Sequence, residues 1–408
     1  MRICMVAYTF YETDNRVRRY AETLARRGDQ VDVIVLRRPT QSSFDVIRRV
    51  NVFRIQQRVV DESSPITYLL KLLAFFFRSS WTLTRHHLRC KYDVIHVHSV
   101  PDFEVFSTLV PRLLGAKIIL DIHDIVPELY ASKFKISEKS FVFRLLLWME
   151  KLSVRYSHHV IVANHLWFER LLGRSARPDR TSAILNYPDP TLFGGQEQTT
   201  KPARKEFVLC YPGTLSHHQG VDLIIAAMDR LRDRMPNLKL KIFGDGPERA
   251  RLDAMVAKLG LGDRITIGAG VALEQVAEAM KGVDLGVEPK RKQSFGNEAL
   301  STKIFEFMAM GVPVLASDTR INQLYFGDGL VEFFTSDDID DLANGIVGLL
   351  QDAPARSRLS ERGLDYIKSN NWNVKKDEYL NLIDRLVSPG RKEISQPDRS
   401  VATIPHVP

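Results

Sequence analysis

Short apolar segments rich in valine and isoleucine recur along the chain, and they alternate with segments whose apolar residues have helical spacing. In the first half these apolar segments are residues 4–8, 31–36, 93–97, 117–120 and 160–162. The second half repeats the pattern at residues 207–211, 238–243, 264–267, 284–287 and 312–316. Strands that alternate with helices predict βαβ units and parallel sheets. The pattern therefore predicts two doubly wound α/β domains in tandem.

The domain boundaries follow from length and from the breaks in this pattern. A chain of 408 residues with 44% apolar composition is long enough for two separate cores. Residues 188–206 contain many glycine, proline and polar residues, which predicts a linker. We expect a first domain over residues 1–188 and a second over 206–371. Residues 389–408 have no apolar pattern, so we expect a disordered tail.

Cysteine usage and hydropathy predict a cytoplasmic protein. Cys4, Cys90 and Cys210 lie far apart, without the spacing of a disulfide framework or a zinc site. The start of the chain shows no basic leader followed by a long apolar run, so no export signal is expected. No uncharged apolar run approaches the roughly 20 residues that span a bilayer.

The positive charge is concentrated in the first half of the chain. Residues 1–200 hold 29 Lys and Arg against 20 Asp and Glu, whereas residues 201–408 hold 28 against 29. Such an excess suits an anionic membrane surface or an anionic acceptor, and no nucleic-acid-binding motif accompanies it. Residues 68–88 are both apolar and basic. They are interpreted either as a helix on an anionic membrane, which would make the protein peripheral, or as a core-packed helix with a charged edge.

The strongest candidate for a functional site is the segment 297–315. Glu298 and Glu306 lie eight residues apart within it, and Ser301 or Thr302 is expected to cap a helix that contains Glu306. Lys303 falls in the first turn of that helix, where a cation opposes the helix dipole unless an anion is bound in front of it. A diphosphate at the helix N-terminus would resolve this conflict.

Two further loops follow predicted strands. Gly244-Asp245-Gly246 is expected to place either Asp245 or Gly246 as a helix N-cap, at the sheet edge where nucleotides bind in open α/β folds. His123 follows the strand 117–120 of the first domain, within Asp-Ile-His-Asp. His123 and the adjacent Asp124 either act on a substrate or only fix a loop.

These segments resemble family 4 of the retaining glycosyltransferases. The resemblance rests on Glu298-x7-Glu306 followed by Phe-Met-Ala-Met-Gly-Val-Pro-Val, on Tyr-Pro-Gly-Thr-Leu-Ser-His-His-Gln-Gly at 211–220, and on Phe-Gly-Asp-Gly-Pro-Glu at 243–248. It implies the α/β GT-B fold, with two Rossmann-like domains that face a cleft and a C-terminal helix at about 372–388 that crosses back to the first domain. It also implies a nucleotide-sugar donor, with UDP expected, and a saccharide or lipid-linked acceptor, without a cofactor or a metal.

The resemblance assigns roles to individual residues. His123 and Glu298 are implied to contact the transferring sugar, and Glu306 the ribose. The other expected donor-site residues are Gly213, Thr214, Gln219, Gly244, Asp245, Gly246, Ser301, Thr302 and Lys303. On the acceptor side we expect Asn15, Arg16 and His98. His96 and His98 are expected to point to opposite faces of the sheet and therefore not to share a metal.

The chain departs from the family where a diphosphate would leave. Most members carry Arg and Lys at the positions of Thr214 and Gln219, and losing that charge would remove several kcal/mol of transition-state stabilisation. Lys303 is the expected substitute. His217 and His218 are expected to help if they are protonated, and Arg291 or Lys292 lies nearby in the loop before Glu298. The alternatives are a nucleotide-sugar 2-epimerase of the same fold, a glycoside hydrolase with two carboxylates, and a non-catalytic subunit of a polysaccharide-assembly complex.

Overall fold

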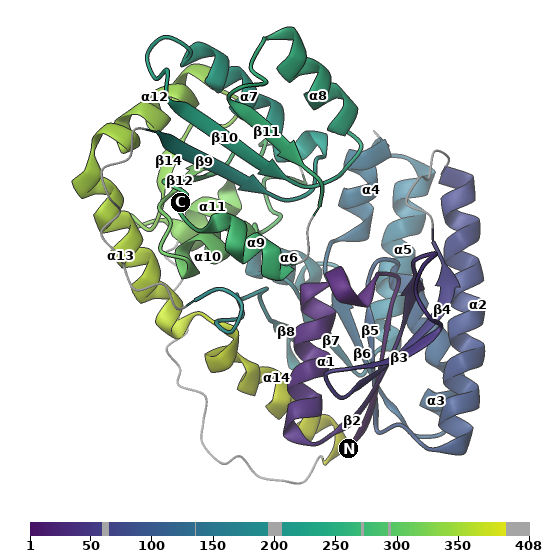
Figure 1. Ribbon diagram of the computed structural model, residues 1–408. Coiled ribbons are helices and arrows are strands. Elements are labelled where there is room, and N and C mark those ends of the chain that lie inside the picture. The colour runs from purple at the N-terminus through teal and green to yellow at the C-terminus, as the bar shows by residue number, and fades with distance from the viewer. Residues whose placement is uncertain (59–64, 135, 195–205, 271–272, 293–294, 389–408) are drawn as a thin grey trace.

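The computed structural model describes residues 1–58, 65–134, 136–194, 206–270, 273–292 and 295–388. The chain forms two α/β domains, each built around its own sheet (Figure 1). The expectation of two doubly wound sheets is thus confirmed. The predicted tail at 389–408 and much of the predicted linker lie outside the described residues.

The first sheet has eight strands in the order β3-β4-β2-β1-β5-β6-β7-β8. All neighbours are parallel except β3, which runs antiparallel to β4. The central strands are buried on both faces, which explains their continuous apolar runs. The strands are β1 (Arg2–Ala7), β2 (Gln30–Arg37), β3 (Phe44–Ile47), β4 (Val50–Gln57), β5 (Val94–His98), β6 (Lys117–Ile122), β7 (His159–Val162) and β8 (Thr181–Ala183).

Helices cover both faces of the first sheet. Helix α1 (Asn15–Arg27) starts where the Asp14 side chain accepts a hydrogen bond from the Val17 amide. It ends at Gly28, which has a φ of 101°. The elements are η1 (Tyr11–Thr13), α1 (Asn15–Arg27), α2 (Pro65–Arg89), η2 (Asp102–Thr108), α3 (Leu109–Leu113), α4 (Val126–Phe134), α5 (Phe141–Tyr156), α6 (His165–Leu172) and η3 (Pro178–Arg180).

The second sheet has six strands, all parallel, in the order β11-β10-β9-β12-β13-β14. Its strands are β9 (Phe207–Pro212), β10 (Leu238–Phe243), β11 (Ile265–Gly268), β12 (Leu285–Glu288), β13 (Val314–Ser317) and β14 (Glu332–Phe334). Its helices are η4 (His217–Gln219), α7 (Val221–Arg230), α8 (Arg249–Lys258), α9 (Leu273–Met280), α10 (Thr302–Ala309), α11 (Arg320–Phe326), α12 (Ile339–Gln351) and α13 (Ala353–Ser369). The strand order reverses between β9 and β12, which is where ligands bind in open α/β sheets.

The expected start of α8 is wrong. The helix begins at Arg249, with Glu248 as its N-cap residue, instead of beginning directly after Asp245 or Gly246. Residue 246 is closely packed, since a Cβ there would lie 2.3 Å from the carbonyl oxygen of Leu215. The Glu248 amide donates to that same oxygen over 3.0 Å. The segment before α8 is therefore bound to the neighbouring loop.

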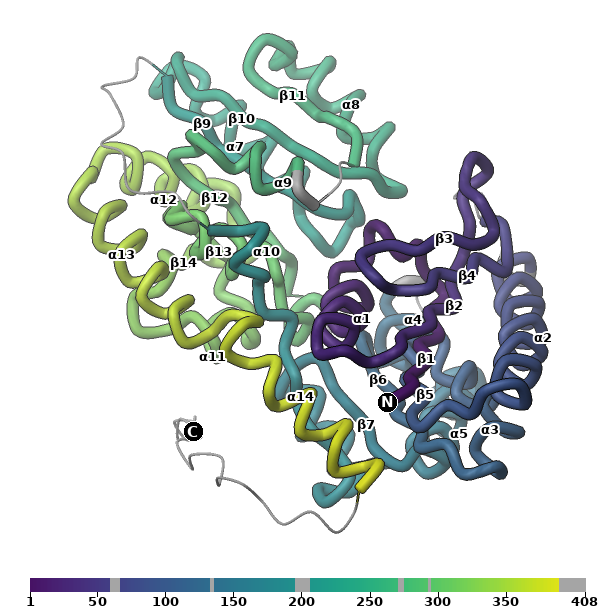
Figure 2. Tube along the Cα trace, turned by 60° about the horizontal axis from the view of Figure 1, so that its bottom comes forward, coloured from purple at the N-terminus to yellow at the C-terminus, as the bar shows by residue number. Residues whose placement is uncertain are grey.

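The C-terminal helix α14 (Trp372–Val387) crosses back and lies along the first domain (Figure 2), as the family resemblance implies. Its buried side chains, among them Tyr379, belong to the same apolar cluster as the residues of α1 and β1. The Trp372 indole donates to the Thr23 hydroxyl over 2.8 Å. A second contact between the domains comes from Phe295, whose ring stacks on Trp167 of α6 with centroids 5.8 Å apart.

Candidate active site

The N-terminus of α10 carries a lysine in its first turn and has no side chain that caps it. Ser301 occupies the N-cap position, but its hydroxyl accepts no hydrogen bond from the helix amides. Lys303 in the first turn donates to Gln219 Oε1 over 3.2 Å and lies 5.2 Å from the centre of the Tyr211 ring. Among the described residues no carboxylate oxygen lies within 4 Å of its ammonium group. The Lys303 ammonium group therefore marks the point where the start of α10 meets the loop after β9.

Glycines let the loops after β9 and β10 close around this point. A Cβ on Gly244 would lie 1.8 Å from the carbonyl oxygen of Gly213, so the two loops touch through their backbones. A Cβ on Gly213 would lie 3.2 Å from both Cδ and Nζ of Lys303, and Gly213 has a φ of 152°. The carbonyl of Thr214 accepts from the Tyr211 hydroxyl over 3.1 Å. The predicted residues of the two loops and of α10 are thus brought together.

Asp245 lies in this group but points to its rim. Its carboxylate accepts from the Gly270 amide over 2.9 Å and lies 3.7 Å from the Arg249 guanidinium. The side chain is largely exposed. Asp245 therefore holds the end of its own loop against β11.

Two groups of α10 have displaced pKa values. Burial raises the pKa of Glu306 to about 7, although Lys303 and the Thr302 side chain oppose the shift. Burial lowers the pKa of Lys303 to about 8, against the attraction of Glu288. Both groups change their charge near neutral pH, which is typical of functional sites.

Lys290, which we did not predict, is a second buried cation in this region. It is 2% exposed and donates to the Ala299 carbonyl over 2.7 Å, and its Nζ lies 3.4 Å from Glu288 Oε1. Burial raises the pKa of Glu288, but Lys290 and Lys303 outweigh this effect and hold it below its usual value. The sequence signal is a Glu-Pro-Lys that directly follows the apolar part of β12.

Three side chains expected near Lys303 do not supply a free cation. Arg291 pairs with Asp222 over 2.7 Å and also with Asp337, and Lys292 pairs with Asp318. Burial lowers the pKa of His218 to about 4, so that side chain is neutral at pH 7. His218 was expected to help only if protonated, and this condition is not met at pH 7.

Glu298 connects the two domains. Its carboxylate lies 2.6 Å from Arg170 of α6 and 3.5 Å from Arg320 of α11, and its carbonyl accepts from Asn164 Nδ2 over 3.0 Å. Arg170 also lies 3.2 Å from Glu128. The predicted contact of Glu298 with a sugar stays a prediction, while this structure shows its carboxylate held by two arginines.

A buried polar cluster surrounds Asp121 in the first domain. Its two carboxylate oxygens each accept a 2.7 Å hydrogen bond from Arg16. His96 Nε2, His98 Nδ1 and His123 Nε2 lie 3.5, 3.3 and 3.4 Å from Asp121 Oδ2. Burial opposes ionisation of Asp121, but Arg16 and His123 outweigh it and hold its pKa well below the usual range.

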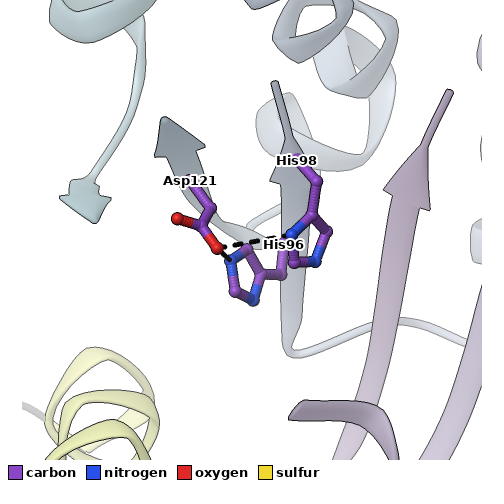
Figure 3. A group of neighbouring side chains, drawn as sticks. All are labelled: His96, His98 and Asp121. Atoms are coloured by element: carbon purple, nitrogen blue, oxygen red, sulfur yellow. Dashed lines mark ion pairs between the residues drawn. The ribbon is translucent and has the colours of Figure 1, made fainter. Parts of the chain in front are cut away.

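The expectation that His96 and His98 face opposite sides of the sheet is wrong. Figure 3 shows both rings on the side of Asp121, stacked with centroids 4.1 Å apart. Alternate residues of a strand share a face, so positions i and i+2 must point the same way. Potential ligand atoms of His96, His98 and Asp121 all lie within 4.8 Å of one another. Arg16 already occupies both oxygens of Asp121, and His96 Nδ1 bonds the Tyr379 hydroxyl over 2.9 Å.

The acceptor-side expectation is corrected for Arg16. This residue is 3% exposed and also donates to the carbonyl of Ile184, over 2.8 Å, so it fastens α1 to the segment directly after β8 instead of facing a ligand. Asn15 begins α1 and is half-buried. His98 and His123 are 3.0 Å apart at their ring nitrogens, and both line a cavity of about 210 Å³. The other lining residues are Ala7, Tyr8, Thr9, Asp14, Arg58, Tyr68, Ser99, Val100 and Asp124.

Comparison with known proteins gives two family matches, one for each domain. Residues 13–186 match the glycosyl transferase 4-like domain, and residues 196–365 match glycosyl transferases group 1. The chain is similar to the alpha-D-kanosaminyltransferase of Streptomyces kanamyceticus, with 23% identity over 85% of this chain and 92% of that protein.

Two other similarities point the same way. The D-inositol 3-phosphate glycosyltransferase of Stackebrandtia nassauensis is 27% identical over 54% of this chain, and the match spans about half of that relative (53%). The solved structure of Anabaena HepE in complex with UDP-glucose has a TM-score of 0.69 at 15% identity, and the match covers 94% of this chain and 100% of that one. At that identity the likeness shows the fold alone, which is GT-B.

Proposed function

We propose a function from the family to which the chain belongs, family 4 of the glycosyltransferases. The protein transfers a sugar from a nucleoside-diphosphate sugar to a saccharide or lipid-linked acceptor. The transferred sugar retains its anomeric configuration. UDP is the proposed nucleotide, because a relative in fold has been solved with UDP-glucose. The products would serve surface polysaccharide or glycolipid synthesis. The free cysteines agree with a reducing, cytoplasmic location.

The observation that carries this proposal is the uncapped N-terminus of α10 with Lys303 beside it. A diphosphate bound there would receive hydrogen bonds from first-turn amides and an ion pair from Lys303. Lys303 would thus take the place of the cations that most family members have at the positions of Thr214 and Gln219. Gln219 accepts a hydrogen bond from Lys303 and so orients the ammonium group.

Charge develops on the leaving diphosphate as the glycosidic bond breaks. Lys303 and the helix amides stabilise that charge, so we propose a reaction that needs no metal ion. Glu306 would accept hydrogen bonds from ribose hydroxyls. His123, at the cavity in the first domain, would face the transferring sugar, and Asp121 would hold its ring in place.

A panel of nucleotide sugars tests the proposed activity. The purified protein is incubated with UDP-, GDP-, ADP- and dTDP-sugars in the presence of EDTA, and thermal stabilisation and sugar release are measured. One nucleotide class should stabilise the protein and be hydrolysed slowly without an acceptor. Recovery of an epimerised sugar would indicate the 2-epimerase, and no response to any donor would favour the non-catalytic subunit.

Donor binding should depend on pH in a narrow range. Glu306 has a pKa of about 7 and is mostly ionised above pH 7. Lys303 has a pKa of about 8 and is mostly protonated below pH 8. We expect the donor affinity, measured by calorimetry, to be highest between these two values and to fall on either side. Glu306→Gln should flatten the acid side, and Lys303→Arg the basic side, because arginine stays protonated. Equal affinity from pH 6 to 9 would contradict these assignments.

The ion pair between Glu298 and Arg170 can be separated from a direct sugar contact. We expect Glu298→Gln and Arg170→Met each to lower turnover by about tenfold, and the double variant to lower it little further, because both changes break one interaction. Turnover is measured by nucleotide release. If Glu298→Gln abolishes turnover while Arg170→Met leaves it unchanged, Glu298 contacts the donor independently of Arg170.

A further inference from the structure

The first domain leaves an apolar surface uncovered on one side. Helix α2 packs against both η2 and α3, and η2 packs against α5, so these elements are neighbours (Figures 1 and 2). In the described part of the chain, no helix has the length and hydropathy needed to cross a bilayer.

Helix α2 is apolar on two opposite sides. Leu72, Phe75 and Leu83 point into the core and are at most 2% exposed. Phe77 and Trp81 lie about half a turn away and are 67% and 70% exposed. A helix at the surface of a soluble domain has a polar outer side, so packing within this chain does not explain the outer side of α2. Its exposed apolar residues are Leu69, Leu70, Leu73, Phe77, Trp81 and Leu88.

The neighbouring helices extend this surface. Trp148 of α5 and Leu113 of α3 are 55% and 73% exposed. The other exposed apolar side chains here are Leu109 and Val110 of α3, Leu114 directly after α3, and Phe141, Val142 and Leu145 of α5. Together with the outer side of α2 they form what we call the basic apolar face. An exposed apolar surface of this extent marks an interaction site.

The charges on this face have one sign. Helix α2 contains no aspartate or glutamate, and the one acidic residue of α5, Glu150, is buried and paired with Arg174. The exposed cations on α2 and α5 are Arg78, Arg85, Arg89, Arg144, Lys151 and Arg155. Exposed rings among exposed cations, without carboxylates, are the composition that binds an anionic lipid surface.

A basic cavity adjoins the same helix. It lies between β4 and α2 and has a volume of about 590 Å³. Arg37, Arg54, Lys71 and Arg78 line it, and none of its lining residues is acidic. Arg54 is neutralised by Glu12, whereas the Arg78 guanidinium donates to the backbone carbonyl of Ile55. The cavity thus places further positive charge at the edge of the face.

We propose that the basic apolar face docks the protein on the surface of an anionic phospholipid bilayer. The rings of Phe77, Trp81 and Trp148 enter the boundary between headgroups and acyl chains, and the surrounding cations contact lipid phosphates. The adjoining cavity accommodates a headgroup phosphate. A second copy of the chain fits the face poorly, because a symmetric contact would bring its cations against one another.

Vesicle sedimentation tests this proposal. The full chain should sediment with phosphatidylcholine vesicles that contain phosphatidylglycerol and not with vesicles of phosphatidylcholine alone. Phe77→Ser with Trp81→Ser, and Arg78→Glu with Arg85→Glu, should each weaken this binding about tenfold or more. All four side chains are exposed, so both double variants should fold.

The controls change matching residues outside the face. Val374 is 50% exposed on α14, and Lys258 is exposed at the end of α8, so Val374→Ser and Lys258→Glu should leave vesicle binding unchanged. Equal binding by the double variants and the parent chain would overturn the proposal. So would a dimer, seen by light scattering, that the double variants abolish. Donor hydrolysis without an acceptor should be unaffected in all variants, which keeps this test separate from the proposed activity.

Discussion

Replacing Lys303 by methionine should lower the rate of sugar release from the donor about 100- to 1,000-fold, the usual effect of removing one group that stabilises developing negative charge. No other described cation lies free at the start of α10, because Lys290 bonds the Ala299 carbonyl and Arg291 pairs with Asp222. Methionine fills a similar volume, so the fold should be kept. Turnover at saturating donor measures the effect.

Lys292→Met is the matched control for this experiment. Lys292 is a lysine of the same region, 42% exposed at its side chain and paired with Asp318. We expect its turnover to stay within about twofold of the parent chain, since exposed ion pairs contribute little. A Lys303→Met variant that kept more than about a tenth of the activity would contradict the role of Lys303.

Asp121→Ala should destabilise the first domain by about 3–5 kcal/mol, the range for removing one partner of a buried ion pair. Arg16 would remain 3% exposed without its carboxylate, and His96, His98 and His123 would lose a shared neighbour. The midpoint of thermal unfolding, followed by circular dichroism, measures the loss.

Asp179→Ala provides the comparison. Asp179 pairs with Arg177 at the surface, where the two side chains are 54% and 71% exposed, and the change should cost less than about 1 kcal/mol. Because the pKa of Asp121 is held well below its usual range, its stabilisation is present above about pH 4 and is lost as the pH falls further. An Asp121→Ala variant as stable as Asp179→Ala would contradict a stabilising role for the cluster.

The sequence predicted the two sheets because strands buried on both faces leave continuous apolar runs, as in β1 and β5. It also predicted that Lys303 lies in a first helical turn, where α10 has it, and from the conflict with the helix dipole it predicted a bound anion. The start of α8 escaped prediction because a contact between Gly246 and Leu215 decides it. The orientation of His96 and His98 did not need a structure, because the two-residue repeat of a strand already fixes it.

Contacts between distant segments explain the rest of the difference. Arg170 and Glu298 are 128 positions apart, and no local pattern connects α6 with the segment before α10. Arg16 was expected to face an acceptor because it lies at the start of a helix. Its actual partner, Asp121, is 105 positions away and buried with it. Pairing over such distances depends on how the two sheets are folded and cannot be read from composition or spacing.

We propose that the start of α10 binds the diphosphate of a nucleotide sugar, and this claim can be tested by calorimetry with nucleotide fragments. The base preferred in the donor panel is supplied as nucleoside, monophosphate and diphosphate, to the parent chain and to Lys303→Met. We predict that the diphosphate binds the parent chain at least about tenfold more tightly than the monophosphate, and that Lys303→Met removes this difference. Equal affinity of the parent chain for monophosphate and diphosphate, or an unchanged preference in Lys303→Met, would contradict the claim.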